Sequence, residues 1–215
     1  VLFDVDGTLL NTHEFIVSAY EHALASIGRP VTRSEAEAYL LLGKNLRATY
    51  AHMMPDEDTE LLATRHHEFQ RDRFHLIQPF NGAREVLNAL KNSGQKLAAV
   101  TNRARASALP SLENAGLRDF FDVFVCPEDT LRTKPDPEHI HTALRALGRE
   151  AENAWMVGDT AVDIEAAHAA NVRSIGISHS KQEGIRESRP HHVVFSLPEI
   201  LPIVLMENTR DDVQP

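Results

Sequence analysis

Short apolar runs alternate with amphipathic segments in the chain after residue 80. Such runs are typical of strands that are buried on both faces of a parallel sheet. Strands are predicted at 1–3, 96–100, 122–126, 154–157 and 172–177, with a short edge strand at 192–195. Helical spacing of apolar residues occupies 83–93, the stretch up to about 115, 137–147, 160–170 and 198–206. This alternation predicts an α/β fold with a doubly wound parallel sheet.

The stretch before residue 80 differs, because no strand-like run occurs between residues 11 and 95. Helices are predicted at 11–28, 32–41, 45–54 and from Pro55 to about Leu76. The first two helices carry capping-box pairs at their starts, namely Asn11 with Glu14 and Thr32 with Glu35. A later helix contains Pro110, so we expect it either to kink there or to begin near Leu109.

About ninety residues separate the first strand from the strand expected beside it at 96–100. A crossover between parallel strands needs only about a dozen residues. The excess predicts a helical insertion, residues 11–79, attached directly after the first strand. The insertion would cover the strand ends as a lid, while residues 1–10 and 80–215 would form the α/β core.

Composition narrows the functional classes. The formal net charge is −9 and the isoelectric point is about 5.7, which argues against nucleic acid or an anionic membrane as the main partner. A single cysteine, Cys126, is expected in the core; it excludes internal disulfides and fits a reducing cytoplasm. No apolar run reaches the roughly 18 residues of a membrane span, and no signal peptide is visible. The chain begins inside a strand without Met, so we expect a few residues to precede it; monomer and homodimer both remain open.

Polar side chains follow the ends of the predicted strands. They are Asp4 and Asp6 after the first strand, Thr101 and Asn102 after the second, Lys134 in TKPDP after the third, and Asp159 after the fourth, with Asp163 four residues further on the same helix face. The carboxyl ends of parallel strands meet at one edge of a sheet. Four carboxylates against one lysine leave a formal charge of about −3, which is costly without a cation. Oxygen ligands without His or Cys at metal spacing favour Mg²⁺.

A metal beside a lysine makes an anion pocket. The Thr101 hydroxyl, the Asn102 amide and free N–H groups in the Gly7 turn could bind phosphate oxygens. An ionised aspartate can act as a nucleophile without a base. We favour Asp4 for this role, because it ends the strand and would be held rigidly. Asp6 would then protonate the leaving oxygen and activate water.

Four segments carry a resemblance to a known family. DVDGTL, the strand that ends in Thr101, TKPDP and GDTAVD resemble, in order, the four motifs of the haloacid dehalogenase-like hydrolase superfamily. The helical insertion resembles the cap of the phosphoglycolate phosphatase-like branch, which also includes bacterial pyrophosphatases and β-phosphoglucomutases. The resemblance implies an Asp4 nucleophile, an Asp6 acid/base, and phosphate contacts from Thr101 and Lys134. It also implies Mg²⁺ held by the Asp4 side chain, the Asp6 carbonyl and Asp159, with Asp163 in support.

The insertion adds two candidate substrate contacts. LGKNLR breaks the helical pattern with Lys44 and Arg47, and it resembles the cap loop that approaches substrate in this branch. His66 and His67, in contrast, are expected on an exposed helix face, because the histidines show no metal-binding spacing.

Several activities remain open. The leading prediction is a Mg²⁺-dependent phosphatase for a small phosphorylated metabolite, acting through an aspartyl-phosphate. A pyrophosphatase is the first alternative, because NTHEFIVSAYEHAL and residues 96–140 resemble that relative. A sugar phosphomutase and a phospho-accepting signalling module are further alternatives. A metal-free dehalogenase is disfavoured by Asp6 and the acidic cluster.

Overall fold

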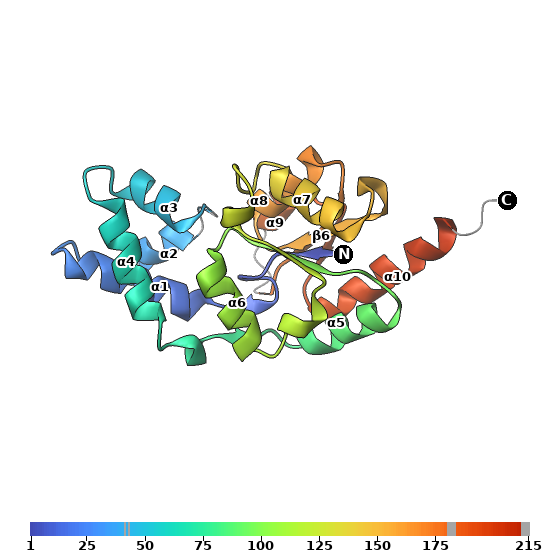
Figure 1. Cartoon of the computed structure of the whole chain (residues 1–215), viewed down its shortest axis with the longest axis horizontal. Coiled ribbons are helices and arrows are strands. Elements are labelled where there is room, and N and C mark those ends of the chain that lie inside the picture. Colours follow the sequence, from blue (N-terminus) through green and yellow to red (C-terminus); the bar gives the residue numbers. More distant parts are fainter. Residues whose placement is uncertain (41, 43, 180–183, 212–215) are drawn as a thin grey trace.

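A six-stranded parallel sheet forms the centre of the computed structural model, which describes residues 1–215 apart from 41, 43, 180–183 and 212–215, and no side chains beyond Met206 (Figure 1). In spatial order the strands are β5 (Val123–Val125), β4 (Ala98–Val100), β1 (Leu2–Phe3), β6 (Trp155–Gly158), β7 (Arg173–Ile177) and β8 (His192–Val194). All neighbouring pairs are parallel. The doubly wound α/β fold predicted from the sequence is confirmed, and so is the edge strand at 192–194.

The first strand lies in the middle of the sheet, with β4 on one side and β6 on the other. Leu2 and Phe3 are both fully buried but belong to different apolar clusters, because successive side chains of a strand point to opposite faces. Burial on both faces explains why this strand reads as a continuous apolar run. It also places the carboxyl end of β1 between the ends of its two neighbours.

Helices cover both faces of the sheet (Figure 1). The cluster that contains Phe3 includes side chains from α5 (Ala83–Asn92), α6 (Arg105–Asn114) and α10 (Ile200–Asp211). The cluster that contains Leu2 includes side chains from α7 (Glu138–Leu147) and α8 (Ala161–Ala169). The shorter helices are α9 (Gly184–Glu187) and the 3₁₀ turns Phe74–Leu76, Arg118–Phe120, Pro127–Asp129, Ala151–Asn153 and Leu197–Glu199.

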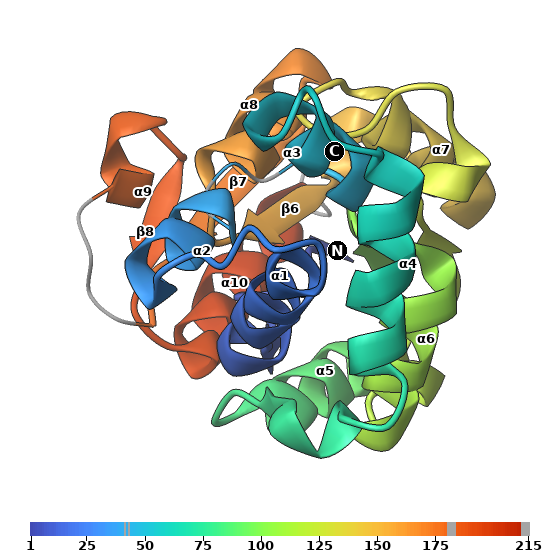
Figure 2. The same cartoon turned by 90° about the vertical axis from the view of Figure 1, so that its left-hand side faces the viewer.

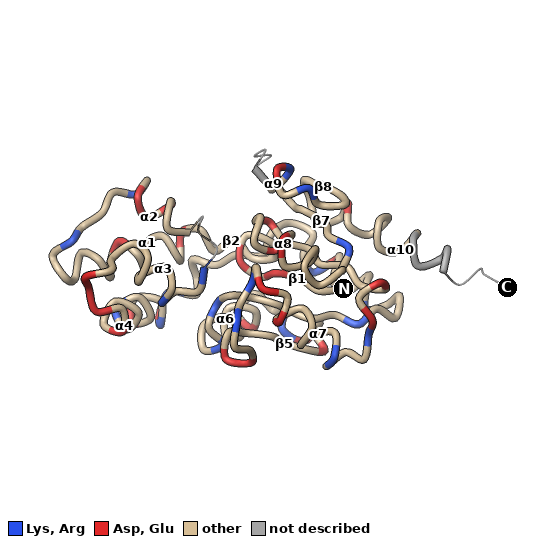
Figure 3. Tube along the Cα trace, turned by 90° about the horizontal axis from the view of Figure 1, so that it is seen from above, with Lys and Arg blue, Asp and Glu red and all other residues tan. Residues whose placement is uncertain are grey.

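Four helices lie at one end of the molecule, and Figure 2 views the chain from that end. They are α1 (His13–Ser26), α2 (Arg33–Leu40), α3 (Leu46–Met53) and α4 (Thr59–Gln70). This four-helix group has an apolar core of its own, in which the Tyr20 ring contacts the rings of Tyr39, Tyr50 and His66. The group is attached after β1, as the sequence predicts, and Figure 3 shows it beside the core.

A small antiparallel ribbon joins the two parts. β2 (Leu10–Asn11) pairs with β3 (Gln78–Pro79) in the register Leu10↔Pro79. The expectation of no strand between 11 and 95 is therefore wrong. Two-residue strands are too short to show an alternating pattern, which is why sequence periodicity misses them.

Several predicted helix limits also change. Because Asn11 lies in the ribbon, α1 begins at His13, and its N-cap Thr12 makes no side-chain cap bond. The second capping box is confirmed: the Thr32 N–H donates to Glu35 at 2.7 Å, and the Glu35 N–H donates to the Thr32 hydroxyl at 3.3 Å.

Other elements deviate further along the chain. α4 ends at Gln70 instead of near Leu76, where a 3₁₀ turn takes over. α6 begins at Arg105 and continues through Pro110, so the alternative start near Leu109 is wrong. α10 continues to Asp211, beyond the predicted end at 206.

Two expectations about buried groups have opposite outcomes. His66 is only 2 % exposed, so its predicted exposed position is wrong. Cys126 is a free, buried thiol, as predicted. Within the residues that the structure describes, no helix has both the length and the hydropathy that a membrane crossing would need.

Candidate active site

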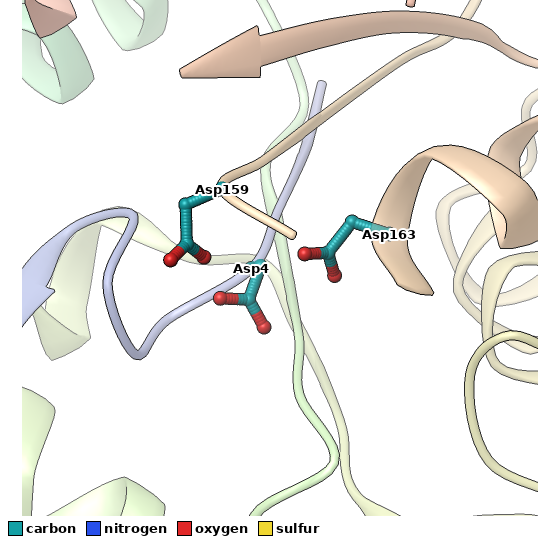
Figure 4. A group of neighbouring side chains, drawn as sticks. All are labelled: Asp4, Asp159 and Asp163. Atoms are coloured by element: carbon teal, nitrogen blue, oxygen red, sulfur yellow. The ribbon is translucent and has the colours of Figure 1, made fainter. Parts of the chain in front are cut away.

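Three carboxylates converge at the carboxyl edge of the sheet. Asp4 follows β1, Asp159 follows β6, and Asp163 lies in the first turn of α8. One oxygen from each of the three lies within 4.8 Å of the others. Figure 4 shows the Asp4 carboxylate between those of Asp159 and Asp163 in this view, with the three side chains coming from three separate segments. Carboxylates that follow separate strands thus lie close together at one edge of the sheet, as expected from the positions of the strand ends.

Asp159 and Asp163 meet through a turn and not along a shared helix face. Asp159 precedes the N-cap Thr160, and the Asp163 carboxylate accepts hydrogen bonds from the Thr160 N–H at 3.2 Å and the Thr160 hydroxyl at 2.7 Å. A Cβ on Gly158 would stand 2.2 Å from the Cβ of Asp163. Gly158 therefore allows the start of α8 to lie against the end of β6.

Lys134 reaches the cluster from the loop after β5 and is 3 % exposed. Its ammonium donates to Asp4 Oδ1 at 2.7 Å, to Asp163 Oδ1 at 2.6 Å and to the Val100 carbonyl at 2.8 Å. Asn102 holds the same loop: its amide donates to the Lys134 carbonyl at 2.9 Å and accepts from the Lys134 N–H at 3.0 Å. Asn102 thus positions the lysine backbone and also lines the cavity described below.

The buried charges do not balance within the cluster. Burial raises the pKa of Asp4 to about 7; Lys134 opposes this rise, whereas Asp163 adds to it. Burial, followed by Asp4 and Asp163, raises the pKa of Asp159 well above its usual range. Burial alone would lower the pKa of Lys134, but Asp163 and Asp4 raise it, so the lysine stays charged. One ammonium against three carboxylates fits a site for a hard divalent cation.

The turn after Asp6 is shaped around Asp159. Gly7 has φ +80°, and a Cβ there would stand 2.1 Å from Asp159 Oδ2. The Thr8 hydroxyl donates to Asp159 Oδ1 at 3.1 Å. The Gly7 N–H donates to the Leu10 carbonyl at 2.8 Å, so it is not one of the free donors expected in this turn. The contribution of Gly7 visible in the structure is the space that it leaves for a carboxylate.

Asp6 lies beside the cluster and has a partner that the sequence analysis missed. The Arg103 guanidinium donates to Asp6 Oδ1 at 2.9 Å, and the Arg103 N–H donates to the Thr101 hydroxyl at 3.0 Å. Arg103 also lies over the ring of Phe15 in α1, 4.8 Å from its centroid. The available signal was its position directly after Thr101 and Asn102.

A cavity of about 700 Å³ separates the sheet edge from the four-helix group. Its core side includes Asp4, Asp6, Gly7, Thr101, Asn102, Arg103, Lys134, Asp159 and Asp163. Lys44 and Arg47 line the opposite side, as do Gln70 and His67. The Arg47 guanidinium is paired with Glu60 of α4, with Nη2 and Oε2 2.9 Å apart. Both cations predicted from LGKNLR therefore face the same cavity as the carboxylates.

His179 is a further residue that the sequence did not reveal. It lines the cavity, its ring stacks on Phe80 at 3.6 Å, and its Nε2 lies 2.9 Å from the Thr8 carbonyl. It therefore braces the turn that carries Gly7 and Thr8. No motif marks it, because its partners Thr8 and Phe80 are far away in sequence.

Comparison with known proteins places this geometry in a family. Residues 1–177 match the family model described as haloacid dehalogenase-like hydrolase. This chain belongs to the haloacid dehalogenase-like hydrolases. It is similar to Pyrophosphatase PpaX of Halalkalibacterium halodurans, with 35% identity over 208 residues that cover 95% of each chain.

Two solved structures share the fold. A predicted phosphatase from Clostridium acetobutylicum superposes with a TM-score of 0.83 at 23% identity, covering 95% of this chain and 97% of that chain. A predicted phosphoglycolate phosphatase from Haemophilus somnus 129pt gives a TM-score of 0.83 at 21% identity, covering 94% and 96%. The family resemblance read from the four motifs is confirmed, and this haloacid dehalogenase-like hydrolase is an enzyme.

Proposed function

We propose that this hydrolase is a Mg²⁺-dependent phosphatase that acts on a small phosphorylated metabolite through an aspartyl-phosphate on Asp4. The observation that carries the proposal is the group of Asp4, Lys134, Asp159 and Asp163, of which all but the half-buried Asp159 are buried, in the lining of one cavity. Residues 1–10 and 80–215 would be the catalytic core, and residues 11–79 the cap. The single, buried and free cysteine supports a cytoplasmic location.

Asp4 would attack the phosphorus atom, so that a bond forms to its carboxylate oxygen while the bond to the leaving oxygen breaks. Asp6 would give its proton to the leaving oxygen and later take a proton from the water that hydrolyses the aspartyl-phosphate. Thr101 and Lys134 would bind phosphoryl oxygens. All three Lys134 donors are used in the cluster, so the lysine would exchange one of those contacts for phosphate.

The carboxylates present fit Mg²⁺ by chemistry and by charge. Asp4, Asp159 and the carbonyl of Asp6 would hold the ion, as the family resemblance implies. Asp163 would support them, because its two oxygens already accept from Lys134 and Thr160. When bound, the metal neutralises the cluster and polarises a phosphoryl oxygen.

The cap would decide which substrates fit. A cavity of about 700 Å³ lies within the range of roughly 300–1,000 Å³ usual for small-molecule sites. Lys44 and Arg47, on the cap side, would meet the end of the substrate away from the transferred phosphoryl group. Cations there favour a second anionic group, such as a carboxylate or another phosphate, for which Arg47 would exchange its contact with Glu60.

Inorganic pyrophosphate is the second candidate substrate. It also presents an anion beyond the transferred group, and a relative named pyrophosphatase is 35% identical over 95% of this chain. A phosphomutase would need a bisphosphate, and nothing on the cap side of the cavity favours one. The signalling-module alternative finds no support, because the chain belongs to a hydrolase family.

A substrate panel with and without Mg²⁺ tests the proposal. It should include p-nitrophenyl phosphate, phosphoglycolate and pyrophosphate, and phosphate release is measured. Wild type should turn over at least one of them only with Mg²⁺. Asp4→Asn should fold normally and lose turnover. Asp119→Asn, an exposed change on the core surface, should fold normally and keep turnover. Substantial activity in Asp4→Asn would overturn the mechanism.

A further inference from the structure

A chain of polar side chains runs from Asp6 into the cap. The Arg103 guanidinium donates to Asp6 Oδ1 at 2.9 Å and, through Nε and Nη2, to the Ser107 hydroxyl at 3.0 and 2.6 Å. The Ser107 hydroxyl in turn donates to Gln70 Oε1 at 3.3 Å. We call Arg103, Ser107 and Gln70 the cap–core relay. It is a hydrogen-bonded route from the proposed acid/base to α4.

The cap end of the relay is anchored on a buried imidazole. Gln70 Nε2 lies 3.0 Å from His66 Nε2, and the Tyr50 hydroxyl lies 3.0 Å from His66 Nδ1. An amide NH₂ can only donate, so His66 Nε2 accepts and Nδ1 carries the hydrogen that points to Tyr50. Burial lowers the pKa of His66 well below its usual range, which keeps the ring neutral and able to accept. The Gln70 amide is thereby held in one orientation.

The Ser107 hydroxyl connects Arg103 to Gln70, and all of its hydrogen-bonding capacity is used in doing so. A hydroxyl has one hydrogen and two lone pairs. In Ser107 the hydrogen goes to Gln70 and the lone pairs receive the two Arg103 N–H groups. Ser107 and Gln70 are 6 % and 4 % exposed, so water cannot replace these partners without reorganisation. Without Gln70, the hydrogen of the Ser107 hydroxyl has no fixed acceptor, so Ser107 holds the Arg103 guanidinium less firmly and Arg103 is left with its contacts to Asp6 and Phe15.

We propose that Ser107 and Gln70 are positioning residues that act through Arg103 to aim the Asp6 carboxyl at the leaving oxygen. The proposal rests on the proposed acid/base role of Asp6. Gln70 is the last residue of α4 in the cap, and Ser107 lies in the first turn of α6 in the core; Figure 2 shows these helices next to each other. Asp6 is therefore aimed only while the cap is seated on the core.

If the relay aims Asp6, the loss of kcat/KM in relay variants should depend on the leaving group of the substrate. An alkyl phosphate releases an alkoxide unless Asp6 donates its proton, whereas p-nitrophenyl phosphate releases a stable phenolate that needs little protonation. A misaimed Asp6 should therefore slow alkyl ester cleavage more than aryl ester cleavage. The ratio of the two kcat/KM values reports this step, because kcat/KM covers events up to phosphoryl transfer to Asp4. The ratio does not depend on the fraction of protein that is folded.

The variants are Gln70→Leu, Ser107→Ala and the double variant, with the neighbouring exposed Arg71→Ala as matched control. The aryl-to-alkyl ratio, with glycerol phosphate as the alkyl ester, should rise about tenfold in each single relay variant, a part of the roughly 10²–10⁴ that acid–base catalysis contributes. The double variant should rise no further, because both residues act through one contact. Arg71→Ala should match wild type.

Asp6→Asn separates failure of this inference from failure of the proposed function. If Asp6→Asn leaves the ratio unchanged, the acid role itself is wrong. If Asp6→Asn raises the ratio but Gln70→Leu and Ser107→Ala do not, the relay is overturned, even when both variants lower the unfolding temperature. A double variant whose effect equals the product of the single effects would also overturn it.

Discussion

At the residue scale, the missing side chain of Gly7 leaves the space that the Asp159 carboxylate occupies. A Cβ on Gly7 would stand 2.1 Å from Asp159 Oδ2, and the backbone at Gly7 has φ +80°. Gly94 has nearly the same φ, +81°, but a Cβ there meets nothing within 4 Å. The two glycines therefore separate backbone strain from steric displacement of a carboxylate.

Gly7→Ala should lower kcat/KM at least about 100-fold, because a displacement of the Asp159 carboxylate by about 1 Å is enough for such a loss. Gly94→Ala should cost about 1 kcal/mol of unfolding free energy from the left-handed backbone alone and leave kcat/KM unchanged. Steady-state kinetics and urea unfolding of both variants check this. Equal kinetics in the two variants would show that the Gly7 contact does not matter.

For Lys134, too, the surroundings of the side chain decide how much its replacement changes the unfolding free energy. It is a buried cation between two buried carboxylates, whereas Lys91 makes a partly exposed pair with Asp122 at 3.0 Å. Removing one partner of a buried ion pair leaves uncompensated charge, which costs far more than the loss of a surface pair.

Lys134→Met should lower the unfolding free energy by about 3–5 kcal/mol at about pH 8, and Lys91→Met by less than about 1 kcal/mol. Protonation of Asp4 can relieve the lost contact, so the cost for Lys134→Met should shrink as the pH falls. Urea unfolding at several pH values measures both variants. A pH-independent loss would point to packing instead of charge.

At the element scale, α4 contributes His66 to the core of the four-helix group, and its last residue, Gln70, belongs to the cap–core relay. His66 is buried among the rings of Tyr20 and Tyr50, and burial lowers its pKa well below 6.5. The folded chain therefore holds His66 neutral, while the unfolded chain binds a proton below about pH 6.5. The free energy of unfolding that the buried, neutral His66 contributes is therefore fully present above about pH 6.5 and is lost as the pH falls below that value.

Replacing His66 with Phe should flatten the pH dependence of stability below about pH 6.5. Wild type should lose up to about 1.4 kcal/mol per pH unit more than His66→Phe in this range. Exposed His52 on α3 supplies a matched control, and His52→Phe should follow the wild-type slope. Chemical unfolding between about pH 5 and pH 8 gives the three curves; parallel curves for wild type and His66→Phe would contradict the argument.

At the scale of the whole molecule, acidic residues are spread over cap and core (Figure 3), and the net charge is −9. Among the residues that the structure describes, the buried side chains of Asp4, Lys134 and Asp163 gather at the sheet edge. Because burial raises the pKa of Asp4 to about 7 from 3.8, the metal-free fold retains a proton there that the unfolded chain releases. This term makes the metal-free protein less stable as the pH rises from about 4 to 7.

Mg²⁺ should reverse that trend, because metal binding competes with protons. At a Mg²⁺ concentration about 100-fold above the Kd at about pH 8, the wild type should gain about 2.7 kcal/mol at that pH. The same concentration should give a smaller gain at about pH 6, where protons compete for the carboxylates. Asp159→Asn should lose most of the gain, and Asp119→Asn should keep it. Unfolding temperatures are compared with NaCl at equal ionic strength to remove general screening. A gain that survives in Asp159→Asn would place the metal elsewhere.

Local patterns in the chain were sufficient to predict the sheet, the inserted helices, the four motifs and the family. This holds because β1 is buried on both faces and reads as apolar, and because Asp4, Thr101 and Asp159 directly follow strands whose ends must meet. The capping box of Thr32 with Glu35 is likewise local, since its partners are three residues apart.

Contacts between distant segments were decided only by the tertiary structure. Ser107 meets Gln70 across 37 positions and Arg103 meets Asp6 across 97, so no spacing rule reports them. The burial of His66 and the pairing of Asn11 in the ribbon likewise depend on which elements pack together. Sequence periodicity states that a residue lies on a helix or strand, but the partner of a polar group is set by packing, and the predicted control of Asp6 by the cap follows from that packing.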